Sequence, residues 1–286
     1  MDPHEAAQRS ARVAATFDRV ADTYDAVGVP WFTPIAEHLV AEVAPAPGER
    51  ALDVGTGRGA ALWALAGAVG ATGHVTGLDL APAMIDATRR EADARGLTTV
   101  DLVVADATAP DLPGDSFDLA VASLVLFFMP DPPVALHAWH SLLVPGGRLG
   151  LSTFGPRDAA WEQVDDVFTP FLPPQLLDAR TSGRSGPFAS DAGVEELVAG
   201  AGFSEVRTAT FEQAVTFVDV EQWRRWSWSH GQRTHWDAVP VERRDDVLAA
   251  AAERLESARD STGTFTLTQQ VRLTVGVRPV VSPRGT

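Results

Sequence analysis

The sequence predicts an α/β fold in which a doubly wound, mostly parallel sheet carries an antiparallel closing strand and a helical cap. Between residues 50 and 154, short apolar runs alternate with helical stretches, a pattern typical of parallel strands covered by helices on both faces. A glycine-rich turn follows the first apolar run, and an acidic residue ends each of the next two. Two later segments, 156–187 and 219–260, interrupt the alternation and predict the cap.

Two helices are expected before the sheet. Apolar residues recur at helical intervals through residues 10–26, and Ser10 stands where an N-cap is expected. A second apolar helix, 35–43, follows Pro34 and ends at the Pro- and Gly-containing run 45–48. Both helices therefore precede the first predicted strand.

The alternating segments give the order of the remaining elements. Strands are expected at 50–54, 74–79, 99–105, 117–122 and 148–153, with helices at 58–69, 82–95 and 134–143. An acidic helix at 161–168 is followed by a helix at 191–201, a strand at 205–217, a helical region at 219–259 and a closing strand at 265–277. We therefore divide the chain into N-terminal helices (1–45), a ligand-binding core (46–155), cap insertions (156–187 and 219–260) and the remainder of the core sheet (188–218 and 261–280).

Length and composition restrict the function. The 286 residues, 45% hydrophobic and 21% charged, suffice for a large core. Cysteine is absent and all 23 basic residues are arginine, which excludes disulfides, thiolate metal sites and lysine Schiff bases. The net charge of -15 disfavours a nucleic-acid partner. Residues 1–10 show no secretory signal, and the longest apolar run, 119–129, is shorter than the ~20 residues of a membrane span. We expect a cytoplasmic protein without a membrane span.

Three glycines lie at alternate positions between a predicted strand and a predicted helix. Gly55, Gly57 and Gly59 permit a tight turn and a close approach of a ligand to backbone amides, beside the positive end of a helix dipole. The spacing is G-x-G-x-G, whereas dinucleotide-binding proteins carry G-x-G-x-x-G. Asp53, two residues before the first glycine, either receives a ligand ammonium group or anchors the loop.

Acidic residues also end the next two predicted strands. Asp79 ends the strand at 74–79, where doubly wound folds hold ribose hydroxyls, and Asp106 follows the strand at 99–105. Because the carboxyl ends of parallel strands meet at one edge of a sheet, Asp53, Asp79 and Asp106 are expected in one crevice. The three together predict a ligand of the nucleoside type.

The order of these motifs resembles the class I S-adenosylmethionine-dependent methyltransferases, in particular the small-molecule branch related to ubiquinone and menaquinone biosynthesis. The similar segments are FDRVADTYD (17–25), LDVGTGRG (52–59), GLDLAPAM (77–84), Asp106-Ala107, SFDLAVAS (116–123) and LVPGGRL (143–149). The resemblance implies a Rossmann-like sheet, N-terminal helices that cover the cofactor, and S-adenosylmethionine held by Tyr24, Asp53, Gly55, Thr56, Gly57, Gly59, Asp79, Leu80, Met84, Asp106, Ala107 and Ser123. A histidine pair frequent in the family is replaced by Phe127-Phe128.

The cap segments follow predicted strands and are therefore expected to overhang the ligand crevice. Four of the eight tryptophans lie within residues 223–236, and at helical spacing Trp223, Trp226, His230 and Arg233 share one face. The tryptophans either pack the cap onto the sheet or form an aromatic pocket for a flat acceptor with an anionic group. For the pocket, the candidate acceptor-binding residues are Trp31, Phe128, Phe154, Trp161, Trp223, Trp226 and Arg233.

Methyl transfer from a sulfonium mainly requires in-line placement of the acceptor, although an oxygen acceptor gains from a base. His230 and Glu162 are the candidate bases, with His235 and Asp165 as neighbours on the same cap segments, and a packing role is the competing interpretation for each. No residues have convincing metal-ligand spacing, so no metal site is expected, although a metal carried by a diphosphate acceptor stays open.

The predicted function is methyl transfer to a carbon or oxygen of a small, largely hydrophobic metabolite, of the secondary-metabolite, quinone-like or prenyl type. The alternatives are a catalytically silent cofactor-binding partner and a cyclase with the same fold. A nicotinamide-dependent oxidoreductase is disfavoured by the glycine spacing and by the absence of lysine. The acceptor's identity and the oligomeric state stay open.

Overall fold

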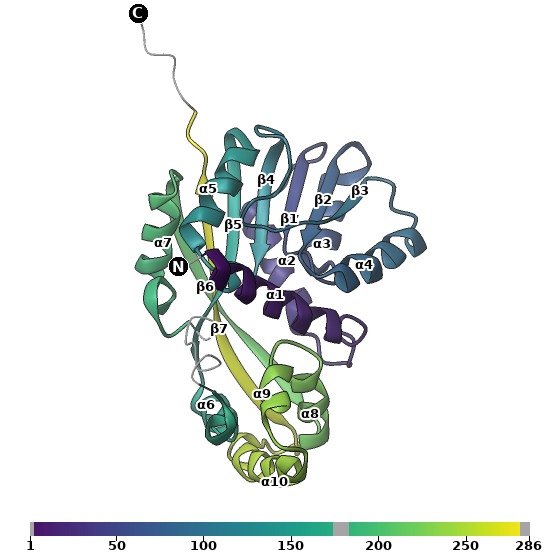
Figure 1. Cartoon of the computed structure of the whole chain (residues 1–286), viewed down its shortest axis with the longest axis vertical. Coiled ribbons are helices and arrows are strands. Elements are labelled where there is room, and N and C mark those ends of the chain that lie inside the picture. Colours follow the sequence, from purple (N-terminus) through teal and green to yellow (C-terminus); the bar gives the residue numbers. More distant parts are fainter. Residues whose placement is uncertain (1–2, 174–182, 281–286) are drawn as a thin grey trace, which may run out of the picture.

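The computed structural model describes residues 3–173 and 183–280 and contains one seven-stranded sheet (Figure 1). The strands are β1 (Arg50–Val54), β2 (His74–Asp79), β3 (Val100–Val104), β4 (Phe117–Ser123), β5 (Leu143–Arg157), β6 (Ser204–Phe217) and β7 (Phe265–Val277). Their order is β3-β2-β1-β4-β5-β7-β6, with the first five parallel and β7 antiparallel to both neighbours. The predicted fold class is confirmed.

Helices cover both faces of the sheet. The connections through α3 (Ala60–Val69) and α4 (Pro82–Ala94) step along the sheet in one direction, and the connection through α5 (Pro132–Leu142) steps in the other. Connections between parallel strands of one sheet are right-handed. Helices α3 and α4 therefore lie on one face of the sheet and α5 on the opposite face. Helix α2 (Phe32–Val43) packs beside α3, and α7 (Asp191–Gly200) packs beside α5. The strand order reverses between β1 and β4, where the sheet opens a crevice.

The N-terminal helices start earlier than the sequence predicted. Helix α1 spans Pro3–Val20, so Ser10 lies inside the helix and the predicted N-cap is wrong. The first two turns of α1 carry few apolar residues, and apolar periodicity therefore could not reveal them. Helix α2 begins at Phe32, because Pro34 is tolerated in a first turn and the Asp25 carboxylate accepts hydrogen bonds from the amides of Trp31 and Phe32.

The cap lies at the far end of three long strands (Figure 1). Strand β5 extends beyond the predicted 148–153 at both ends, and β6 and β7 run with it out of the core. Helices α6 (Ala159–Asp165), α8 (Val220–Trp228), α9 (Arg233–Ala238) and α10 (Arg244–Leu255) gather around these strand ends. The predicted helical region 219–259 therefore contains three α-helices, α8, α9 and α10. Residues 174–182 of the predicted insertion lie outside the described residues.

Short 3-10 helices complete the described chain: η1 (Gly70–Thr72), η2 (Leu126–Phe128), η3 (Thr169–Phe171), η5 (Gly186–Ala189), η6 (Val241–Arg243) and η7 (Glu256–Ala258). Within residues 3–173 and 183–280, no helix combines the length and the apolar character that crossing a membrane requires.

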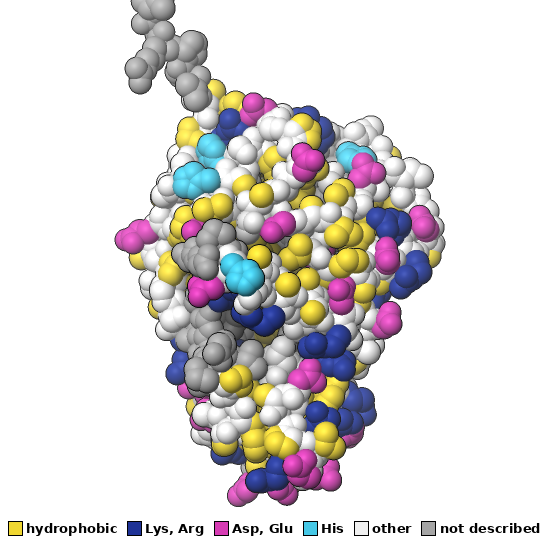
Figure 2. Space-filling view, viewed as in Figure 1, with side chains coloured by type: hydrophobic (Ala, Val, Ile, Leu, Met, Phe, Trp, Pro, Cys, Tyr) yellow, Lys and Arg dark blue, Asp and Glu magenta, His cyan; other side chains and the backbone are white. Residues whose placement is uncertain are grey.

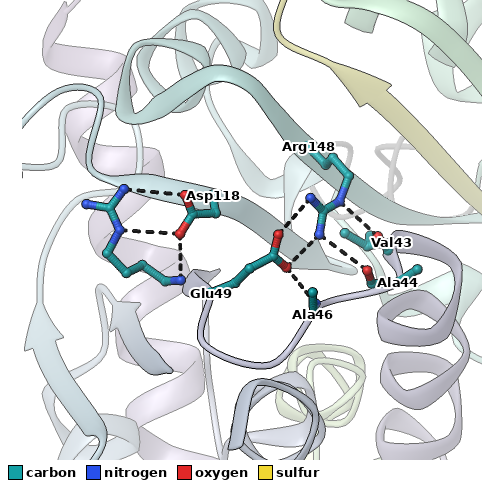
Figure 3. Close-up of polar contacts among 7 residues, drawn as sticks. Val43, Ala44, Ala46, Glu49, Asp118 and Arg148 are labelled. Atoms are coloured by element: carbon teal, nitrogen blue, oxygen red, sulfur yellow. Dashed lines mark hydrogen bonds and ion pairs between the residues drawn. The ribbon is translucent and has the colours of Figure 1, made fainter. Parts of the chain in front are cut away.

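Ion pairs hold together the amino ends of the central strands (Figure 3). Arg50 on β1 pairs with Asp118 on β4, and Arg148 on β5 pairs with Glu49 while also donating to the carbonyl of Val43. Although partial burial acts to raise it, the pKa of Glu49 lies below its ordinary value, because Arg148 and the Ala46 amide donate hydrogen bonds to the carboxylate. The charges of Arg50, Asp118, Arg148 and Glu49 therefore compensate one another in pairs.

Candidate active site

The loop between β1 and α3 brings backbone amides to the carboxyl end of the sheet. Gly55, Gly57 and Gly59 take φ angles of +67°, +50° and +85°, which residues with a side chain rarely adopt. A Cβ on Gly55 would lie 2.5 Å from Val125, whereas a Cβ on Gly57 would have no neighbour nearer than 4.0 Å. The loop thus turns tightly at Gly55 and leaves open space beside Gly57, where a ligand can approach the backbone.

Asp53 is buried at the end of β1 and anchors this loop. Its Oδ2 accepts a hydrogen bond from Thr56 Oγ1 at 2.7 Å. Burial raises the pKa of Asp53 to about 7, and the neighbouring Asp79 carboxylate contributes to the increase. A positively charged ligand group beside Asp53 would stabilise its ionised form, so anchoring the loop and receiving an ammonium group are compatible roles.

The other two strand-end acids are also held by hydrogen bonds rather than by cations. The Asp79 carboxylate accepts from the amides of Gly57 at 2.8 Å and Ala81 at 2.9 Å, and burial raises its pKa. Asp106 Oδ1 accepts from the amide and the hydroxyl of Thr108, at 2.8 and 2.7 Å. Within the described part of the chain, Asp106 Oδ2 has no hydrogen-bond partner, and no ion pair involves Asp53, Asp79 or Asp106.

Two adjoining cavities, of about 430 and 870 Å³, open at this end of the sheet. Both are lined by Tyr24, Phe32, Gly55, Gly57 and Ser123, so they meet at the glycine loop. Of the residues predicted to hold the cofactor, Gly59 lines neither cavity, because it is the N-cap of α3 and lies against the Trp63 ring. The others line one cavity or both: Tyr24, Asp53, Gly55, Thr56, Gly57, Asp79, Leu80, Met84, Asp106, Ala107 and Ser123.

The larger cavity continues from the strand ends into an aromatic chamber under the cap. The Trp31 and Trp161 rings lie 5.1 Å apart, and the Trp31 and Trp226 rings 5.9 Å apart, measured between centroids. Tyr24 stacks on Phe32 at 4.3 Å, and burial raises the pKa of Tyr24 well above its ordinary value, so its hydroxyl stays protonated. Five of the predicted acceptor-binding residues line this cavity: Trp31, Phe128, Phe154, Trp161 and Trp226.

Two predicted acceptor-binding residues, Trp223 and Arg233, lie away from the cavities. Trp223 is fully buried inside the cap, where its ring stacks on Phe168 with the centroids 6.2 Å apart, and it lines neither cavity. Arg233 begins α9 and packs over the Trp228 ring. Because α8 ends at Trp228, the four-residue face predicted from Trp223 to Arg233 does not exist.

The predicted base Glu162 is also placed elsewhere. Its side chain is exposed on the outer side of α6 and pairs with Arg184 at 3.5 Å. Asp165, three residues later on the same helix, lines the larger cavity. The structure therefore brings the neighbouring carboxylate, and not Glu162, to the site.

His230 lines the larger cavity but is poorly suited to act as a base. Its ring packs against Trp226 at 4.4 Å and Phe32 at 5.7 Å between ring centroids. The backbone amide of Gln232 donates a hydrogen bond to His230 Nδ1 at 3.3 Å. Because Nδ1 accepts this bond, the neutral imidazole carries its proton on Nε2. Burial, followed by His235 and Arg157, lowers the pKa of His230 to about 3. His230 therefore presents a neutral ring whose free nitrogen is already protonated.

Sequence reasoning missed a polar cluster at the cap end of the larger cavity. Arg157 ends β5, Gln232 lies between α8 and α9, and Gln269 lies on β7, and all three line the cavity with Asp165 and His235. A lone arginine after a predicted strand carries no distinctive spacing. The cluster forms only when β5, β7 and the cap helices pack together.

Comparison with known proteins gives this arrangement a family. A methyltransferase domain family matches residues 51–147, the segment from β1 into β5. Nocamycin O-methyltransferase from Saccharothrix syringae is 36% identical over 92% of this chain and 98% of its own length. The chain belongs to the class I S-adenosylmethionine-dependent methyltransferases. The predicted family, enzymatic activity and cofactor are thereby confirmed.

Other relatives of this methyltransferase agree. Aklanonic acid methyltransferase from a Streptomyces species is 41% identical over 58% of this chain and 76% of its own length. The YcgJ protein of Bacillus subtilis superposes with a TM-score of 0.58 at 16% identity, covering 86% of this chain and 98% of that one, which shows the common fold. The methyltransferase transfers a methyl group from S-adenosylmethionine to a small molecule.

Proposed function

We propose that this methyltransferase methylates an oxygen atom of a flat, largely apolar secondary metabolite. The observation that carries the proposal is the larger cavity, which joins Asp79 and Asp106 to an aromatic chamber in one space of about 870 Å³. Cavities of this size hold drug-sized ligands. The relative that matches over nearly its whole length is named as an O-methyltransferase of nocamycin, which supports oxygen as the acceptor atom.

For the cofactor, we propose that the strand-end acids bind separate parts of one molecule. The unpartnered Asp106 Oδ2 suits the adenine amino group, Asp79 suits the ribose hydroxyls, and Asp53 in the smaller cavity suits the ammonium group. Leu80 and Met84, which line the larger cavity, supply apolar contacts beside the nucleoside. The open space at Gly57 fits this ligand, because a side chain there would occupy the approach to the loop.

Catalysis then depends mainly on placement. When bound, S-adenosylmethionine supplies a methyl group already activated by a sulfonium, which needs no acid in order to leave. The aromatic walls at Trp31, Phe128 and Trp226 would orient a flat acceptor and exclude water. Since His230 offers no free basic nitrogen in its observed hydrogen bonding, no base is assigned to it.

We also propose that the described residues of segments 156–187 and 219–260 form the acceptor-selecting cap over the core 46–155, because α6 and the α8–α9 connection supply cavity-lining side chains. A cytoplasmic location and the absence of a nucleic-acid partner stay predictions from the sequence. Cell fractionation tests the first and binding to labelled DNA at two salt concentrations tests the second.

The test of the proposed function is release of S-adenosylhomocysteine with a panel of hydroxylated and carboxylated anthraquinones, naphthoquinones, indoles and prenyl diphosphates. We expect turnover with the polycyclic compounds and a new O-methyl resonance in the product. Glu162→Gln serves as a control that retains turnover, because the exposed Glu162 lies outside the cavity. Turnover that yields only carbon- or nitrogen-methylated products would contradict the proposal.

A further inference from the structure

Arg157 is the cation at the cap end of the larger cavity. The other arginines lining that cavity, Arg9, Arg12 and Arg19, belong to α1, and basic side chains gather on this face of the molecule between the sheet and the cap (Figure 2). Arg157 comes instead from the end of β5, and its side chain is 22% exposed. The cavity therefore has an interior cation besides those on its outer helix.

The Arg157 guanidinium is held on several sides. Nε donates to Gln269 Oε1 at 3.0 Å, Nη1 donates to Asp165, and the guanidinium carbon lies 5.4 Å from the Trp161 ring centroid. Gln269 is itself fixed, because its amide nitrogen donates to the carbonyl of Gly155 at 2.6 Å. These contacts restrict the rotation of the guanidinium before any ligand binds, which lowers the entropy cost of binding one.

One donor of this group stays free. Within the described residues, Arg157 Nη2 has no hydrogen-bond partner, although Nε and Nη1 are both bonded. Both oxygens of the partner carboxylate already accept a hydrogen bond, since Asp165 accepts from Arg157 through Oδ2 and from Gln232 Nε2 through Oδ1 at 2.7 Å. The cluster therefore offers the cavity a charged N–H donor at Nη2 that has no hydrogen-bond partner among the described residues.

Apart from the Arg157–Asp165 pair itself, the titratable residues beside the guanidinium carry no charge. His230 and His235 line the same part of the cavity, and burial lowers the pKa of both, so both are neutral near pH 7. A ligand group that only accepts hydrogen bonds and carries negative charge is the complement of a preoriented guanidinium. A carboxylate on an apolar body meets this requirement and also fits the aromatic walls.

We propose that Arg157 binds a carboxylate of the acceptor, so that this methyltransferase favours flat, apolar carboxylic acids. The inference rests on the proposed function and names its substrate class. Gln269 and Trp161 act as positioning residues that hold the guanidinium, and Asp165 is the carboxylate with which the ligand competes for it.

The test compares two probes of equal shape, anthraquinone-2-carboxylic acid and anthraquinone-2-carboxamide, binding to the full chain saturated with S-adenosylhomocysteine. Quenching of tryptophan fluorescence reports the dissociation constants, so turnover is not required. We expect the wild type to bind the acid at least about tenfold more tightly than the amide, as for a charge-assisted hydrogen bond of about 1.4 kcal/mol or more. Asp165→Asn should increase this ratio severalfold, because it removes the competing carboxylate.

Arg157→Met should reduce the ratio to about one while S-adenosylhomocysteine affinity stays unchanged. Because Arg157→Met leaves Asp165 without its cation, the double variant Arg157→Met/Asp165→Asn repeats the measurement without an uncompensated charge. Arg12→Met, which changes a cavity-lining arginine on α1, is the matched control and should keep the wild-type ratio.

A wild-type ratio near one, a ratio that survives in the double variant, or failure of both probes to bind would overturn the proposal. Efficient turnover of neutral acceptors with no preference for acids would overturn it while leaving the proposed O-methylation intact. Loss of all turnover in the acceptor panel, with the preference for the acid retained, would contradict the proposed function and not the role of Arg157.

Discussion

The two halves of the larger cavity are built in different ways. At the strand ends, Asp79 accepts hydrogen bonds from the backbone amides of Gly57, in the glycine loop, and of Ala81, two residues further along the chain. Asp106 accepts from the backbone amide of Thr108, also two residues further along. Under the cap, Arg157 and Gln269 meet across 112 residues of sequence and are joined by side-chain contacts. Among the described residues, Asp79 and Asp106 in the first half form no ion pair, whereas Arg157 in the second half is paired with a carboxylate.

This difference corresponds to the difference between binding a cofactor that many enzymes share and binding an acceptor that is particular to one enzyme. A nucleotide-like cofactor presents the same groups to every enzyme that uses it, so local backbone geometry suffices to bind it. An acceptor differs between enzymes, and long-range packing of the cap can change without disturbing the glycine loop. The cofactor half should therefore tolerate damage to the cap.

The largest expected effect tests that independence through the cap interior. Trp223→Ala removes a fully buried ring and should lower the free energy of unfolding by about 3–5 kcal/mol. Urea denaturation measures the loss, and S-adenosylhomocysteine affinity of the folded fraction should stay within about twofold. Trp228→Ala, at a half-buried position of the same helix, is the control and should cost less. Loss of cofactor affinity in Trp223→Ala alone would show that the halves are coupled.

The same difference explains what the sequence could predict. The turn at Gly57 and the acid at Asp79 depend on backbone conformation and on strand ends, and both can be read from neighbouring residues. The parallel part of the sheet follows from the alternation of strands and helices, although that alternation does not determine the order of the strands. Local pattern was thus sufficient for the sheet and for the cofactor crevice.

Local sequence pattern failed where long-range packing or the end of a helix decides the position of a side chain. The helix containing Trp226 ends at Trp228, so spacing placed Arg233 on a face that does not exist. Glu162 and Asp165 lie on one short helix, and only contact with Arg157 and Gln232 distinguishes the cavity-facing carboxylate. The role of Arg157 could not be predicted, because its partners come from distant elements.

The next effect concerns the cofactor half and its pH dependence. Because burial raises the pKa of Asp53 to about 7, S-adenosylhomocysteine affinity should fall about tenfold from pH 8 to pH 6, as protonation removes the charge that attracts the ligand ammonium. The same raised pKa means that stability decreases as pH rises from about 4 towards 7, since the folded state retains the proton longer. Titration calorimetry across this range should show proton release on binding.

Asp53→Asn is the matched variant for this pH dependence. It should bind weakly and show little change in affinity between pH 6 and 8, because the titrating group is gone. If the affinity of the wild type for S-adenosylhomocysteine does not change between pH 6 and pH 8, Asp53 does not bind the ammonium group.

The smallest effect concerns His230. His230→Gln keeps an N–H donor at the cavity wall, so turnover should fall less than about tenfold and the pH–rate profile should keep its shape. Loss of a general base typically costs about 10²–10⁴-fold. A decrease of that size together with the loss of one ionisation would identify His230 as the base after all.

The most direct measurement of the division between the two halves is calorimetric titration of S-adenosylhomocysteine into Asp79→Ala and Trp226→Ala. Asp79 accepts a hydrogen bond from the backbone amide of Gly57 in the glycine loop, and Trp226 lines the aromatic chamber. Asp79→Ala should bind about tenfold to a hundredfold more weakly, the effect of losing charged hydrogen bonds, while Trp226→Ala should stay within about twofold of the wild type and lose acceptor turnover. Equal weakening in both variants, or unchanged affinity in Asp79→Ala, would contradict the account.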